Sequence, residues 1–106
     1  MIAYKVFYSN REKLYPVAVS FDFEPYDPEF IITRADGCGP FAAFVNLEQA
    51  KRFKNYWKIS QKIFKVNIKK SKNKSLWIDG WMRTDSHIFP EGTILADEFE
   101  ILEEVK

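Results

Sequence analysis

Few side chains in this sequence have the types and spacing that catalysis requires. His87 is the only histidine and Cys38 the only cysteine, so a dyad would need folding to bring His87 beside Cys38, Asp85 or a serine. The run Asp85-Ser86-His87 contains the residue types of a catalytic triad, but a triad is defined by geometry and not by adjacency. No cation next to Cys38 in the sequence stabilises its thiolate. We therefore predict no catalytic residue from this set.

Carboxylates near the C-terminus are a second candidate for chemistry. Glu98 and Glu100 stand two positions apart, so on a strand they would share one face. Paired carboxylates can divide acid and base roles, but Glu103 and Glu104 continue the same acidic surface. A solvated strand face is the favoured interpretation. No spacing typical of a metal site or of a phosphate-binding glycine loop occurs, so no metal and no cofactor are expected.

The strongest pattern is a segregation of charge along the chain. Residues 51–74 carry ten basic residues and no acidic one, residues 1–50 carry four basic and seven acidic, and residues 75–106 carry two and eight. A run of this kind creates a local field that attracts phosphate groups or an acidic protein surface. We predict a binding surface that contains Lys51, Arg52, Lys54, Lys58, Lys69, Lys70, Lys72 and Lys74.

Aromatic residues near these lysines raise the alternative of nucleic acid. Aromatic side chains beside cations stack on bases in single-strand binders, but the spacing of those between residues 53 and 64 is that of core positions. A rim of lysines with Arg52 as its only arginine would bind phosphates weakly and in a salt-dependent manner. If exposed, Trp77 and Trp81 would be an aromatic anchor for a partner.

The elements that must position these residues follow from the periodicity of apolar side chains. Asn46 as the N-cap, Gln49 as its capping-box partner and apolar residues at helical spacing predict a helix over residues 47–57. Alternation and turn residues predict strands over 2–8, 15–23, 30–33, 41–45, 64–68 and 76–78, an irregular connection over 81–92, and one or two closing strands over 93–96 and 98–105. The sequence therefore predicts an α+β fold in which one main helix packs on a mostly antiparallel sheet of about five to six strands.

Length and composition set the class of protein. A chain of 106 residues suits one domain, and 17% aromatic residues indicate a substantial core. A single cysteine allows no intrachain disulfide and fits a reducing, cytoplasmic setting. The N-terminus lacks the pattern of a signal peptide, and no uninterrupted apolar run reaches the roughly 18 residues of a membrane span. We expect neither secretion nor membrane insertion.

Several segments together resemble a known family. They are Gly39-Pro40-Phe41-Ala42-Ala43-Phe44, Asn46-Leu47-Glu48-Gln49-Ala50-Lys51-Arg52-Phe53, Ile63-Phe64-Lys65-Val66, Gly92-Thr93-Ile94-Leu95-Ala96-Asp97 and Glu100-Ile101-Leu102. In these segments the chain resembles a recurrent phage and prophage protein family of unknown function. The resemblance implies a small α+β fold, a place in the host cell cytoplasm and no activity.

The order of elements is also loosely similar to the core of ADP-ribosyltransferase-like domains. In those domains a glutamate on a late strand assists transfer from NAD, so this similarity implies a role for Glu98 or Glu100. It supplies the enzyme alternative.

Three hypotheses follow. The leading one is a non-enzymatic, phage-associated accessory protein that binds another protein through a charged face. The second is weak, non-specific binding of nucleic acid by the same lysines. The third is a nucleotide-using enzyme. Pairing of the basic surface with the acidic C-terminal segment of another copy would give a homo-oligomer.

Overall fold

The computed structural model describes residues 1–15, 26–34, 37–56, 61–78, 82–85 and 89–106. The elements in these ranges are β1 (Ile2–Asn10), β2 (Lys13–Tyr15), β3 (Ile32–Thr33), β4 (Phe41–Phe44), α1 (Leu47–Tyr56), β5 (Gln61–Lys70), β6 (Ser75–Ile78), β7 (Met82–Asp85) and β8 (Thr93–Val105). One helix and a six-stranded antiparallel sheet confirm the predicted α+β fold. Most of the strand predicted over 15–23 lies outside the described residues.

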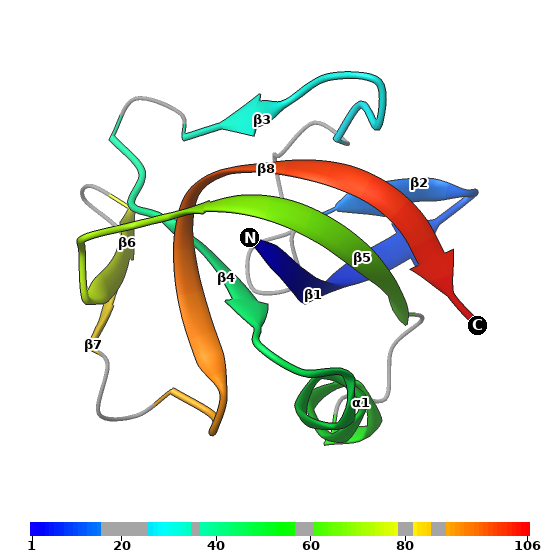
Figure 1. The fold of residues 1–106 in the computed structure, drawn as a ribbon. Coiled ribbons are helices and arrows are strands. Elements are labelled where there is room, and N and C mark those ends of the chain that lie inside the picture. The colour runs from blue at the N-terminus through cyan, green and yellow to red at the C-terminus, as the bar shows by residue number, and fades with distance from the viewer. Residues whose placement is uncertain (16–25, 35–36, 57–60, 79–81, 86–88) are drawn as a thin grey trace.

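Four of the strands close into a ring. β1 pairs with β4, β4 with β8, β8 with β5 and β5 with β1, and every pairing is antiparallel. β2 extends β1 through a tight turn in which Arg11 and Glu12 have φ angles of 52° and 65°. β3 is added to the edge of β8 (Figure 1). The sheet is therefore a small barrel with two short extensions.

β8 is one strand of thirteen residues, bent along its length (Figure 1). Lys69 faces Glu98 across the β5–β8 ladder and Lys70 faces Ala96, which leaves Asp97 as the extra residue of a bulge. Before the bulge β8 pairs with β4, and after it β8 has β5 on one edge and β3 on the other. The segments 93–96 and 98–105, for which one or two closing strands were predicted, thus form one strand with a bulge at Asp97.

Apolar side chains fill both the barrel and the space beneath the helix. The barrel interior holds Phe7, Val66 and Phe99, which are the largest fully buried side chains. A second cluster on the outer side of the sheet contains Val6 and Ile63 and packs against the helix. The helix covers only the part of the sheet around this second cluster.

Only one of the two hydrogen bonds of the predicted capping box is present at the N-terminus of α1. The backbone N–H of Gln49 donates to Asn46 Oδ1 at 3.0 Å, and Ala50 is fully buried against the sheet. The reciprocal half of the predicted capping box is wrong, because Gln49 Oε1 is buried without a hydrogen-bond partner. The Gln49 side chain lies instead against Gly92, where it occupies the space that a Cβ would need.

β6 and β7 form a separate two-stranded sheet. The predicted strand over 76–78 is confirmed, and its described partner is β7. The irregular connection predicted over 81–92 is wrong for Met82–Asp85, which pairs with β6 along its whole length. The side chains of Trp77 and Trp81 lie outside the described part of the chain, so their proposed role as an anchor stays a prediction.

Candidate functional site

The predicted basic surface is divided between the two ends of β5. On α1, Lys51 and Arg52 are exposed and Lys54 is partly exposed, whereas Lys58 lies outside the described residues. The other four lysines, Lys69, Lys70, Lys72 and Lys74, are exposed at the end of β5 and in the turn that follows it; we call them the basic turn. A strand of ten residues spans roughly 30 Å, and α1 packs near Ile63, at the opposite end of β5 (Figure 1). The structure does not join these side chains into one continuous face.

Lysines in the middle of the charge run face the acidic C-terminal segment. Across the antiparallel β5–β8 ladder, Lys62 Nζ lies 3.8 Å from Glu104 Oε1, and Lys65 Nζ lies 3.5 Å from Glu103 Oε1. Partly exposed pairs of this kind contribute about 0–1 kcal/mol each. Their main consequence is that two basic side chains of the run are locally neutralised.

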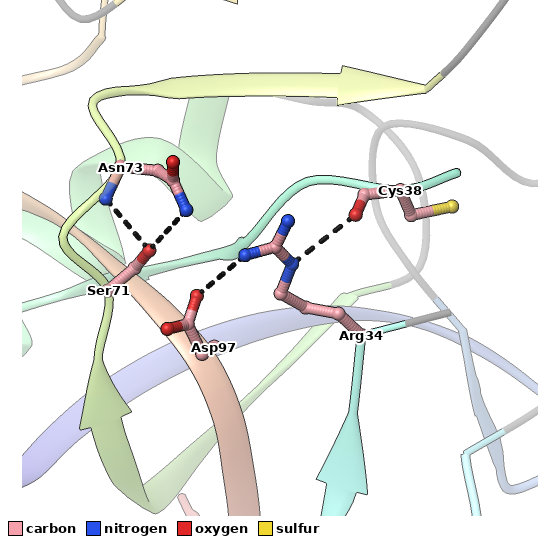
Figure 2. A network of polar contacts seen from close by, with 5 residues as sticks. All are labelled: Arg34, Cys38, Ser71, Asn73 and Asp97. Carbon is pink, nitrogen blue, oxygen red and sulfur yellow. Dashed lines mark hydrogen bonds and ion pairs between the residues drawn. The ribbon is translucent and has the colours of Figure 1, made fainter. Parts of the chain in front are cut away.

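The basic turn is held in a fixed conformation by Ser71. This residue is buried, and its backbone N–H donates to Leu95 O at 2.8 Å. Its hydroxyl oxygen accepts hydrogen bonds from Asn73 N at 3.0 Å and from Asn73 Nδ2 at 3.2 Å (Figure 2). Such local side-chain bonds stabilise turns. Lys70, Lys72 and Lys74 project from this turn, and none of them forms an ion pair with a carboxylate in the described residues.

Asp97, at one of the two register shifts of the β5–β8 ladder, links the turn to the segment after β3. Arg34 Nη1 donates to Asp97 Oδ1 at 3.0 Å, and Arg34 Nε donates to the Cys38 carbonyl oxygen at 3.3 Å (Figure 2). A hydrogen bond from Ser71 lowers the pKa of Asp97, and Arg34 and the nearby Lys69 lower it further. The result is a polar network that fixes the base of the basic turn to β8.

Lys5 is a notable residue that sequence reasoning missed. Its side chain is only 8% exposed, and Nζ donates to Ala42 O at 2.7 Å. The rings of Phe7, Phe41 and Phe99 surround the ammonium, with centroids at 5.6, 5.8 and 5.4 Å. Burial lowers the pKa of Lys5 to about 8.

The position of Lys5 explains why a lysine is tolerated there. β1 and β4 pair through a single residue pair, so the Lys5–Ala42 hydrogen bond adds a second tie across this seam of the barrel. The sequence did hold a signal: Lys5 alternates with Ala3 and Phe7, both of which are fully buried. A charged residue between two core positions is a local inconsistency that marks a special environment.

The candidates for catalysis are not assembled into a site in the described residues. Glu98 and Glu100 alternate with the buried Phe99, so they belong to the outer face of β8, where Glu100 is exposed. The side chains of Asp85 and His87 lie outside the described part of the chain. Among the residues that are described, no group of three potential metal-ligating side chains occurs. Cys38 is partly buried and forms no disulfide.

Comparisons with known proteins add no relative. Neither protein-family models, nor curated proteins, nor solved structures gave a match to this chain. A search of the described residues for a helix long and apolar enough to cross a membrane also found none.

Proposed function

We propose that this protein is a non-enzymatic binding module that engages an acidic surface of a partner protein through the basic turn. One observation carries the proposal: four exposed lysines are grouped within six residues on a turn whose base is fixed by Ser71, Asn73 and Asp97. A turn whose backbone is already ordered loses less conformational entropy when it binds. The resemblance to phage and prophage proteins is the basis for placing this activity in the cytoplasm of a phage host.

The composition of the turn favours a protein partner over nucleic acid. All four cations are lysines, which act as point charges and lack the planar fork with which arginine clamps phosphates or reads bases. The cations on α1 are a weaker candidate, because Glu48 lies four residues before Arg52 on the same side of the helix and offsets its charge.

A capture experiment tests the proposal. The protein is immobilised and exposed to lysate of the organism that carries its gene, with and without nuclease and at two salt concentrations. The test variant reverses the charge of Lys69, Lys70, Lys72 and Lys74, and the control variant reverses Lys51 and Arg52. We expect a nuclease-resistant protein that the control retains and the basic-turn variant loses.

Two results would count against the proposal. Capture that disappears with nuclease, and that weakens steeply as salt rises, would assign the lysines to nucleic acid. Capture that survives reversal of the basic turn but not reversal of Lys51 and Arg52 would move the binding site to α1.

A further inference from the structure

β3 has an unusual edge. It pairs with β8 through Ile32 and Thr33, and no strand in the described part of the chain pairs with its other side. Phe30 and Ile31, directly before β3, are 65% and 59% exposed, more than any other large hydrophobic side chain described. Figure 1 places β3 on the outside of the sheet. An edge of this kind is a template for pairing with another extended chain.

The backbone that presents these two side chains is hydrogen-bonded. Phe30 N donates to Asp27 O at 3.2 Å, which closes a turn, and Glu29 N donates to Asp27 Oδ1 at 3.0 Å. The turn therefore leads the chain directly into the edge. We call residues 27–33 the β3 edge.

The exposed charged side chains within the β3 edge are all acidic. Asp27 and Glu29 are exposed within it, and the exposed Glu100 lies on the adjacent strand β8. Between residues 27 and 33 the sequence contains no lysine or arginine. Arg34, the next cation along the chain, is bound to Asp97 and to the Cys38 carbonyl.

We propose that the β3 edge binds an extended segment of a partner protein in which apolar side chains alternate with lysine or arginine. The segment adds a strand to the sheet, and its backbone pairs with β3. Its apolar side chains lie on the face of Ile32 and contact Phe30, and its cations lie on the opposite face, where their alkyl stems cover Ile31 and their charges approach Glu100. A second copy of this chain fits less well, because two acidic edges would meet and like charges across strands are unfavourable. The site is opposite in charge to the basic turn, and β8 lies between Thr33 of this edge and Lys69 of the turn.

A defined peptide tests the proposal. The probe is a fluorescein-labelled peptide of alternating valine and lysine, and the readout is fluorescence anisotropy. Two further peptides have the same sequence but carry N-methyl groups on every second residue. In one, the methyl groups block the N–H groups along one edge of the strand, and in the other they block those along the opposite edge. We expect binding of the unmodified peptide and at least tenfold weaker binding of one methylated version than of the other.

Matched variants locate the site. Phe30→Ser combined with Ile31→Ser should weaken binding at least tenfold, and both residues are exposed enough for the fold to be retained, which circular dichroism checks. Ile2→Ser, which alters an apolar residue that is 45% exposed on β1, should leave binding unchanged.

Three outcomes would overturn the proposal. Equal binding of both methylated peptides and the unmodified one would mean charge attraction without strand pairing. Unchanged binding by the Phe30 and Ile31 variant would place the peptide elsewhere. A dimer in sedimentation that the same variant dissociates would assign the edge to a second copy of the chain.

Discussion

The β5–β8 ladder and the β5–β6 turn use lysines from the same stretch of sequence in opposite ways. In the ladder, Lys62 and Lys65 lie 3.8 and 3.5 Å from carboxylates of β8. In the turn, Lys70, Lys72 and Lys74 are exposed and form no ion pair with a described carboxylate. The difference teaches that a run of charge in a sequence does not predict a charged surface until the strand partner is known.

Lys5 is a third kind of lysine, because it is buried from solvent and has no carboxylate partner among the described residues. Its titration gives the largest expected effect on the free energy of unfolding. Its pKa falls from 10.5 to about 8 on folding. Below pH 8 the folded state carries a buried ammonium, and above pH 10.5 the amine is neutral in both states. Stability should therefore rise as the pH increases across this window, by up to about 3 kcal/mol for this group.

Chemical denaturation of the wild type and of Lys5→Met between pH 7 and 10.5 measures this effect. The methionine variant removes the titration and keeps a similar volume, and the difference between the two proteins cancels other groups, such as Tyr26, whose pKa is raised by burial. As the pH rises, the free energy of unfolding of the wild type should increase relative to that of the variant. A difference that stays constant over this pH range would mean that burial in the core does not lower the pKa of Lys5.

Asp97→Asn tests the base of the basic turn. We expect a loss of about 1 kcal/mol, because the pair of Arg34 and Asp97 is only partly exposed and its hydrogen bonds are charge-assisted. The pKa of Asp97 is below its ordinary value, so this contribution is complete at neutral pH and disappears as the pH falls through the lowered pKa. Urea titrations at pH 7 and at pH 3 measure it, with Glu100→Gln as an exposed control on the same strand. Equal effects of the two substitutions at pH 7 would contradict the network.

Lys65→Glu and Lys72→Glu compare the two regions directly. The first places a glutamate against Glu103 and should cost about 0.5–1 kcal/mol at low salt, less when salt is added. The second should leave the free energy of unfolding within about 0.5 kcal/mol of the wild type, because Lys72 is exposed and unpaired in the described chain. Thermal unfolding at two salt concentrations measures both. If Lys72→Glu were the more destabilising, the assignment of paired and unpaired lysines would be reversed.

Local patterns predicted the local elements well. Asn46 marks the start of α1, and alternation along Phe64, Val66 and Ile68 marks β5, because capping and periodicity depend on residues close in sequence. The alternation in β1 was more ambiguous. The positions Tyr4 and Val6 suggest one apolar face, but both faces are buried: Phe7 faces the barrel interior and Val6 faces the helix.

Long-range pairing could not be read from the sequence. Closure of the barrel depends on a single β1–β4 residue pair and on the bulge at Asp97, and neither has a local signature. The same is true of the candidate site. The predicted surface did not include Lys62 and Lys65, but the carboxylates that pair with them, Glu104 and Glu103 on β8, lie far along the chain and could not be identified from the sequence. No sequence pattern singled out Ser71 and Asn73, although they fix the turn that presents the lysines.

We propose that the basic turn, and not the run of charge as a whole, presents cations to an acidic partner. The most direct measurement compares the salt concentration at which two variants elute from immobilised polyglutamate. Lys70→Gln with Lys72→Gln and Lys62→Gln with Lys65→Gln each remove two positive charges, so the two variants have the same net charge. We predict that the first elutes well before the wild type and the second close to it; equal losses would mean that retention follows net charge, and would contradict the claim.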